Sequence, residues 1–223
     1  MSILYQNVIP ATFLSRPNRF IADVCLNGHR ERVHVKNTGR CRELLIPGAP
    51  VYLTFSGKPG RKTEYDLIAV RKNTGVLFNI DSQAPNRVVF EWLKKHSFNV
   101  IRPEFRYGES RIDFYMERGN QRFLMEVKGC TLEINGTGYF PDAPTERGVR
   151  HLHTLIQAGK EGYRAIAAFV IQMDGVTQVL PNAATHPAFA SAWREAESAG
   201  VEMLMLPCHV EPDQLSILSE IRL

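Results

Sequence analysis

The stretch RIDFYMERGNQRFLMEVKG, residues 111–129, constrains the fold more than any other part of the sequence. Apolar and polar residues alternate on both sides of Gly119-Asn120, which is the pattern of two strands joined by a two-residue turn. That turn fixes which residues face each other, and one side of the pair then consists of apolar contacts only: Ile112–Val127, Phe114–Met125 and Met116–Phe123. The sequence therefore predicts a β-hairpin with one side in a hydrophobic core.

The same register places Asp113 opposite Glu126, with Cβ atoms about 4.5–5.5 Å apart, and Lys128 points into the same space. Facing carboxylates destabilise a hairpin unless the pKa of one is raised or a cation lies between them. Two carboxylates suit Mg²⁺ or Mn²⁺, and Lys128 is placed to orient or deprotonate an attacking water. Glu104, on the preceding strand, is a third acid that we expect near this pocket. The alternative is a solvated polar side on which Lys128 and Arg111 neutralise the acids.

The hydrophobic pattern changes near residue 82 and divides the chain in two. Before it, short alternating runs predict strands and a small β-barrel or sandwich, with a hairpin turn at Asn27-Gly28. After it, the pattern predicts helix, three strands, helix, buried strand, helix and buried strand. That order is typical of an α/β domain with a mixed sheet.

Positive charge gathers in the first part of the chain. Residues 1–80 hold 12 Lys and Arg against 5 Asp and Glu, and the remainder holds 15 against 18. This division indicates a surface for a polyanion beside a separate carboxylate site, although small β-domains often carry excess basic residues. The candidate basic residues surround NTGR or share one loop: Lys36, Arg40, Arg42, Lys58, Arg61 and Lys62. Nearby aromatic residues are either stacking platforms or core residues: Tyr52, Phe55 and Tyr65.

Other composition features limit the alternatives. The four cysteines are scattered, so we expect reduced packing thiols and a cytoplasmic protein. No signal-peptide pattern and no apolar run long enough to span a membrane is found. His151 and His153 point to different sides of a predicted helix, so they do not predict a zinc site.

The arrangement of Asp113 and the Glu126-x-Lys128 unit resembles the PD-(D/E)xK nuclease superfamily. The flanking sequences sharpen this resemblance: NTGR, IPG, SRIDFYM, EVKGCTL and above all GYFPDAPTERGVRHL resemble the sugar fermentation stimulation protein A family over about residues 13–208. The resemblance implies an OB-like nucleic-acid-binding barrel in residues 1–81 and a PD-(D/E)xK nuclease-like α/β domain with a mixed sheet in residues 82–223. It also implies DNA binding, and a role in regulating sugar (maltose) metabolism genes.

By the superfamily motif, Asp113 and Glu126 would be metal ligands and Lys128 the catalytic lysine, with Glu104 as an additional catalytic acid. Ile112 stands where the motif usually has proline. The helix that follows the sheet carries Arg147 and Arg150, which the resemblance implies contact substrate phosphates; the alternative is a solvated helix face.

Two functions therefore stay open. One is a Mg²⁺- or Mn²⁺-dependent nuclease that hydrolyses phosphodiester bonds. The other is a non-catalytic DNA-binding regulator that keeps the nuclease fold as a scaffold. Both predict a nucleic-acid partner, with DNA favoured over RNA, and neither predicts a membrane partner.

Overall fold

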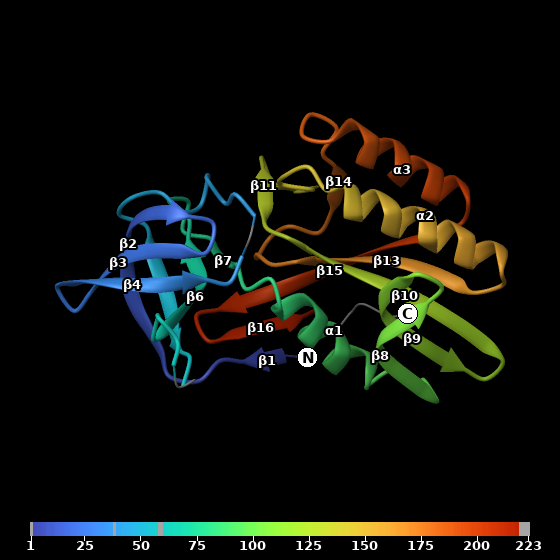
Figure 1. Ribbon diagram of the computed structural model, residues 1–223, viewed down its shortest axis with the longest axis horizontal. Coiled ribbons are helices and arrows are strands. Elements are labelled where there is room, and N and C mark those ends of the chain that lie inside the picture. Colours follow the sequence, from blue (N-terminus) through green and yellow to red (C-terminus); the bar gives the residue numbers. More distant parts are fainter. Residues whose placement is uncertain (1, 38, 58–59, 219–223) are drawn as a thin grey trace.

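The first half of the fold is a small β-barrel (Figure 1). The computed structural model describes residues 2–37, 39–57 and 60–218. The barrel sheet consists of β2 (Val8–Asn18), β3 (Ile21–Leu26), β4 (His29–Val35), β5 (Pro50–Phe55), β6 (Tyr65–Arg71) and β7 (Leu77–Asn79). Their order is β4-β3-β2-β5-β6-β7, and a further pairing of β4 with β6 closes the barrel. The predicted N-terminal barrel is confirmed.

Local sequence explains most of these strands. Asn27 and Gly28 both have positive φ, 51° and 83°, as a two-residue hairpin turn between β3 and β4 requires. The longest strand, β2, was not predicted. Its alternation is broken by Pro10 and Pro17 and by register shifts against β3, so its apolar residues do not keep one phase.

The second half is built on a seven-stranded mixed sheet of order β1-β16-β15-β13-β10-β9-β8. Its strands are β1 (Ser2–Leu4), β8 (Val100–Tyr107), β9 (Ser110–Arg118), β10 (Gln121–Cys130), β13 (Arg164–Ile171), β15 (Glu202–Glu211) and β16 (Gln214–Ile217). The pairs β10–β13 and β13–β15 are parallel, and the others are antiparallel. The predicted mixed α/β sheet is confirmed.

Helices cover both faces of this sheet. Helix α1 (Ala84–Leu93) lies on one face, and α2 (Glu146–Lys160) and α3 (Pro187–Ser198) pack side by side on the other (Figure 1). A small sheet beside α2 contains β11 (Leu132–Ile134), β12 (Thr137–Phe140) and β14 (Val179–Pro181). Over residues 2–37, 39–57 and 60–218, none of the helices is long and apolar enough to cross a membrane.

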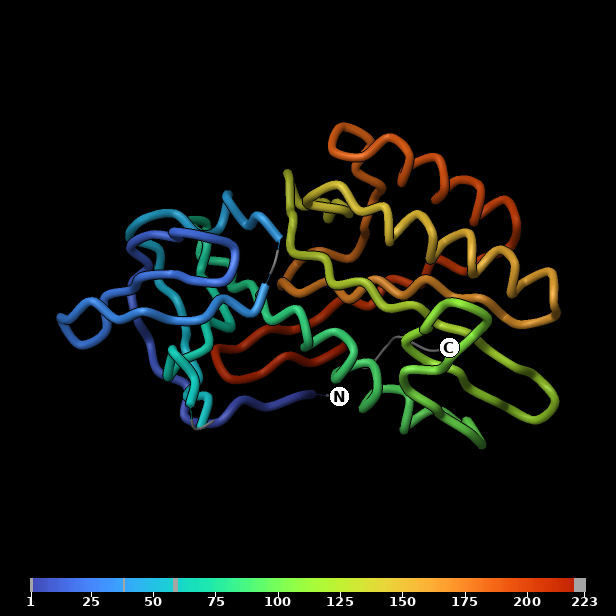
Figure 2. The backbone as a smooth tube through the Cα atoms, in the orientation of Figure 1, coloured from blue at the N-terminus to red at the C-terminus, as the bar shows by residue number. Residues whose placement is uncertain are grey.

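The chain crosses between the two halves more often than a division at residue 82 suggests. Strand β1 precedes the barrel in the sequence but pairs with β16 at the edge of the large sheet. The backbone trace shows this crossing, followed by the return of the chain from β7 into α1 (Figure 2). The first residues of the predicted barrel unit therefore belong to the other sheet.

A buried polar network joins the barrel to the large sheet. The carboxylate of Asp81 is fully buried and accepts hydrogen bonds from Tyr5 Oη at 3.1 Å and Lys36 Nζ at 2.9 Å. Gln172 Nε2 donates to Asn79 Oδ1 at 2.9 Å and to the carbonyl oxygen of Asp81 at 3.2 Å. Because buried polar groups are costly when unpaired, this network favours one fixed arrangement of the two halves.

Candidate active site

The predicted hairpin is formed by β9 and β10, and its register is confirmed close to the turn. Phe123 pairs with Met116, and Met125 with Phe114. Gly119 has φ of 56°, which suits the tight turn. The apolar side of this part of the hairpin packs under α1 in the core that contains Val88 and Trp92.

Beyond Phe114–Met125 the two strands no longer form a ladder, which corrects the predicted geometry. Ile112 packs in the core on the α2 side and does not continue the apolar side of the hairpin. A side chain replaces the missing ladder hydrogen bond, because Asp113 Oδ2 accepts from the backbone N–H of Val127 at 2.7 Å. Asn86 in α1 donates to Asp113 Oδ1 at 2.7 Å. Asp113 is thus held by a helix and a strand.

Glu126 is the most buried acid of the site, with 3% of its surface exposed. Its Oε1 atom accepts a hydrogen bond from Lys128 Nζ at 2.6 Å and forms a second, very short contact with His151 Nδ1. Its Oε2 atom is buried and has no hydrogen-bond partner among the described residues. One carboxylate oxygen is therefore held by two donors, whereas the other has none in the described structure.

His151 lies on the face of α2 that packs against β10, and Arg147 lies one turn before it. Arg147 Nε donates to His151 Nε2 at 3.2 Å. A guanidinium group can only donate, so His151 Nε2 must accept and the ring proton lies on Nδ1, facing Glu126. Lys128 Nζ lies 3.2 Å from Nδ1, but both groups are donors, so the lysine bonds to Glu126 instead.

The two carboxylates differ in their electrostatic environments. Burial and the neighbouring Glu126 raise the pKa of Asp113 above its usual value. For Glu126, burial favours the neutral acid, but the hydrogen bond from His151 and the charge of Lys128 outweigh burial and lower the pKa. The expected upward pKa shift of one of two close acids is therefore found at Asp113, whereas the pKa of Glu126 is lowered.

Glu104 does not join this pair, contrary to the predicted common pocket. The β8–β9 register would place it opposite Asp113, but the backbone turns aside there and Glu104 has φ of 57°. Its side chain is 51% exposed and forms an ion pair with Arg111. Across the described part of the chain, no three His, Cys, Asp or Glu side chains meet as a metal cluster.

Asp113 and Glu126 nevertheless fit a hard divalent cation. The observation that supports this fit is the buried, unpartnered Oε2 of Glu126, because a buried carboxylate oxygen without a donor is costly. Mg²⁺ commonly takes only one or two protein carboxylates and completes its shell with water and substrate phosphate. The residues present would hold such an ion incompletely without a substrate.

A basic groove lies beside these acids, between the start of β9 and α2. It has a volume of about 510 Å³, and its lining includes Ser110, Arg111, Arg147, Arg150 and His151. Arg147 and Arg150 are exposed, so the two predicted phosphate-contacting residues come together there. The carboxylates and the basic side chains thus lie on neighbouring elements.

His151 and Asn86 are the residues of this site that sequence reasoning missed. No local pattern pointed to Asn86, and the spacing of His151 from His153 only argued against a zinc site. The buried face of α2 contains Gly148, His151, Leu152, Leu155 and Ala158. A histidine in phase with small and apolar residues at this spacing was the available signal, because it predicts a ring turned toward the sheet.

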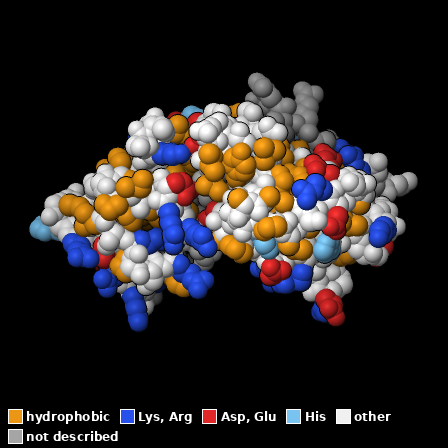
Figure 3. Space-filling model, turned by 90° about the horizontal axis from the view of Figure 1, so that it is seen from above, with side chains coloured by type: hydrophobic (Ala, Val, Ile, Leu, Met, Phe, Trp, Pro, Cys, Tyr) orange, Lys and Arg blue, Asp and Glu red, His pale blue; other side chains and the backbone are white. Residues whose placement is uncertain are grey.

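The predicted basic residues of the barrel separate into two groups. Lys36 and Arg61 are tied to buried acids: Lys36 pairs with Asp81, and Arg61 Nη2 lies 2.6 Å from Asp66 Oδ1. Three others are exposed: Arg40, Arg42 and Lys62. Lys58 lies outside the described residues. Seen from above, Lys and Arg side chains gather on the barrel half (Figure 3).

The candidate stacking residues of the barrel also differ in exposure. Phe55 is exposed and meets Tyr65 edge-on, with ring centroids 5.8 Å apart. Tyr52 and Tyr65 are half-buried, and Tyr52 contacts Arg71. Phe55 is therefore the most accessible of the three rings for contact with a base.

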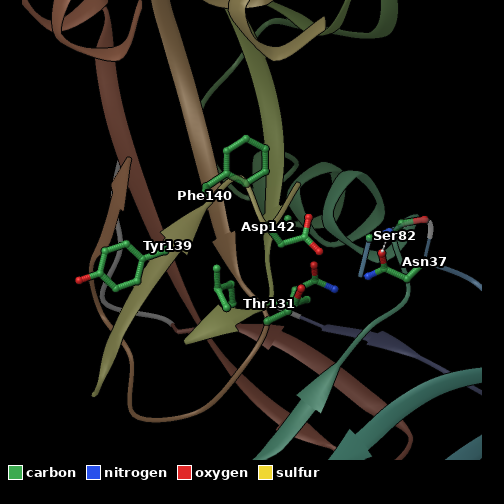
Figure 4. A pocket seen from close by; sticks show the side chains of 10 residues that line it. Asn37, Ser82, Thr131, Tyr139, Phe140 and Asp142 are labelled. Carbon is green, nitrogen blue, oxygen red and sulfur yellow. Dashed lines mark hydrogen bonds between the residues drawn. The ribbon is translucent and has the colours of Figure 1, made fainter. Parts of the chain in front are cut away.

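A second, polar cavity of about 170 Å³ lies where the barrel loop meets the large-sheet half (Figure 4). The side chains of Asn37, Ser82 and Asp142 gather on one side of it, while Tyr139 points away. Asp142 Oδ2 accepts from the backbone N–H of Arg40 at 2.9 Å. This contact links the loop that carries Arg40 and Arg42 to the segment that leads into α2.

Comparison with known proteins matches both halves of the chain to family models. Residues 14–80 match the SfsA N-terminal OB domain, and residues 83–214 match the sugar fermentation stimulation protein RE domain. A sugar fermentation stimulation protein homolog from Desulfitobacterium hafniense (strain Y51) is 51% identical over 95% of this chain and 93% of its own length. The homolog from Clostridium beijerinckii is 47% identical over 96% of each chain.

A solved structure shares the whole fold. It is described as Pyrococcus furiosus SfsA in complex with Ca²⁺, and it matches with a TM-score of 0.84 and 31% identity over 96% of this chain and 95% of that one.

Proposed function

This chain belongs to the sugar fermentation stimulation protein family, and on that premise we propose that it binds nucleic acid and cleaves phosphodiester bonds with a divalent cation. The observation that carries the proposal is the buried Oε2 of Glu126, which has no donor in the described structure and lies in the neighbourhood of the Asp113 carboxylate. The relative described as a Ca²⁺ complex supports divalent-cation binding by this fold.

Each residue has a distinct part in the proposed reaction. Asp113 and Glu126 would hold Mg²⁺ or Mn²⁺, and the ion would stabilise the charge that develops on the phosphate. Lys128, which donates to Glu126, would orient or deprotonate the attacking water. Arg147 and Arg150 would bind phosphate oxygens of the strand. Arg40, Arg42 and Lys62 would extend this contact along the barrel.

A cleavage assay with single-stranded and double-stranded DNA and RNA, with Mg²⁺ or Mn²⁺, tests the proposal. Asp113→Ala should abolish cleavage, and Lys128→Met should slow it by about 10²–10⁴-fold, the usual contribution of a positioned acid–base group. Asp174→Ala is the matched carboxylate control, because Asp174 pairs with His209 away from the groove. Absence of cleavage by the wild-type protein with every substrate and both ions would refute the nuclease proposal.

A non-catalytic nucleic-acid-binding regulator is the second candidate. Two observations favour it: Lys128 is bound to Glu126, and Glu104 lies on the surface with Arg111. This candidate predicts salt-sensitive DNA binding that a chelator leaves unchanged. Cleavage that disappears in the Asp113→Ala variant would exclude it.

A further inference from the structure

Glu126 lies at the end of a chain of side chains that begins in the basic groove. The chain runs from the Arg147 guanidinium to His151 and from His151 to Oε1 of Glu126. His151 is 7% exposed, whereas Arg147 is exposed and lines the groove. A solvent-facing cation is thus connected to a buried acid through one imidazole ring.

We propose that Arg147 and His151 are positioning residues that set the cation affinity of Glu126, and that a nucleic-acid phosphate bound at Arg147 raises this affinity. The inference rests on the proposed function, because it takes Glu126 as a cation ligand. It goes further by assigning His151 a role and by coupling the groove to the metal centre.

The first step is the choice of the imidazole tautomer. A neutral imidazole carries its proton on either nitrogen, and the hydrogen bond made by one nitrogen decides the state of the other. Arg147 Nε donates to His151 Nε2, so the proton is placed on Nδ1. Without Arg147, Nε2 loses its donor and the ring is no longer held from the groove side, so the ring can tilt and its hydrogen bond to Glu126 weakens.

The second step is the orientation of the carboxylate. Lys128 and His151 both donate to Oε1 of Glu126, so two bonds fix the plane of the carboxylate and keep Oε2 free. Partners behind a ligating group typically contribute about 10–100-fold to metal affinity by holding the ligand in place. Removing one of the two donors leaves Lys128 alone, which allows the carboxylate to rotate.

The third step is the coupling to substrate. The Arg147 guanidinium uses Nε for His151, and its two terminal nitrogens suit the oxygens of a phosphate in the groove. A phosphate held there restrains the guanidinium, and thereby the ring and the carboxylate. Linkage then requires that the cation tightens nucleic-acid binding by the same factor, typically about 5–150-fold.

Titration of the purified protein with Mn²⁺ alone, followed calorimetrically, tests the relay without any cleavage step. Arg147→Ala should weaken Mn²⁺ binding about 10-fold, and His151→Ala about 10–100-fold. His151→Asn places an amide N–H near the Nδ1 position, so it should restore most of the affinity. Arg194→Ala is the matched control, because Arg194 is an exposed arginine of α3 that does not line the groove, and it should leave Mn²⁺ affinity unchanged.

The coupling is measured by repeating the titration with an oligonucleotide that carries non-hydrolysable linkages. Wild type and Arg194→Ala should bind Mn²⁺ more tightly with the oligonucleotide, and His151→Asn should lose this gain because it lacks the link to Arg147. Unchanged Mn²⁺ affinity in Arg147→Ala, or an equal loss in Arg194→Ala, would overturn the relay, as would a wild type that binds no Mn²⁺. A protein that shows the relay but cleaves nothing would retain it and lose only the proposed catalysis.

Discussion

Replacing Lys36 with methionine tests whether this lysine stabilises the fold or is free to bind nucleic acid. From the sequence, Lys36 is predicted to contact nucleic acid, but its Nζ lies 2.9 Å from Oδ2 of Asp81. The Lys36 side chain is 16% exposed and that of Asp81 is fully buried. The substitution keeps most of the side-chain volume and leaves a buried carboxylate without its cation.

The size of the loss in stability depends on the hydrogen bonds that Asp81 retains in the variant. Removing one partner of a buried ion pair costs about 3–5 kcal/mol. Asp81 still accepts from Tyr5 Oη at 3.1 Å and from the backbone N–H of Gln83 at 2.9 Å, so we expect the lower end, about 3 kcal/mol. With a urea m-value of about 2–3 kcal/mol per molar, the unfolding midpoint should fall by about 1–1.5 M.

Urea unfolding at neutral pH measures this change in the free energy of unfolding. Lys94→Met is the matched control, because Lys94 pairs with Glu91 at the exposed surface and should change stability by less than about 0.5 kcal/mol. The double variant Lys36→Met with Asp81→Asn should recover most of the loss, since it removes both charges. The reasoning is refuted if Lys36→Met destabilises no more than Lys94→Met.

Two further predictions separate binding from stability. The double variant Arg40→Ala with Arg42→Ala should reduce the steepness of log DNA affinity against log salt concentration by about 1–2. The control variant Arg194→Ala, on α3, should leave this slope unchanged. An unaltered slope in the double variant would show that the NTGR loop does not contact the DNA. Burial acts to raise the pKa of Asp66, but hydrogen bonds from Arg61 and His34 outweigh burial and lower the pKa. The stability that Asp66 contributes is therefore present above pH ~4 and is lost as the pH falls further. Asp66→Asn should therefore destabilise the protein most at neutral pH, and a difference from wild type that grows on acidification would contradict this sign.

The local pattern of the sequence was sufficient for the secondary structure that forms around short-range signals. The Asn27-Gly28 turn and the hairpin near Gly119 both followed from turn chemistry and two-residue alternation. The helices with clear apolar spacing and caps were predicted for the same reason. Strand β1 was missed because it is short and pairs with β16, which is distant in the sequence. Strand β16 was also missed, although it forms a tight hairpin with the neighbouring β15.

In the candidate site, too, some features were predictable from the sequence and others were not. The positions of Asp113, Glu126 and Lys128 in a hairpin were enough to predict that these side chains lie on the same side, because side chains alternate along a strand. The sequence could not show that the ladder ends before Asp113, that Val127 donates to its carboxylate, or that Glu104 turns to Arg111. Those outcomes depend on the twist and irregularity of three strands together.

By itself, the sequence determined the hairpin, the basic first third and the family motifs, because these depend on residue type and spacing along the chain. Only the tertiary structure decided which charges are free for a ligand. It paired Lys36 with the buried Asp81, left Oε2 of Glu126 without a donor in the described structure, and brought His151 from α2 onto β10. The physical reason is that the hydrogen-bond partners and the burial of a polar side chain depend on segments far apart in the sequence, which no local sequence pattern shows.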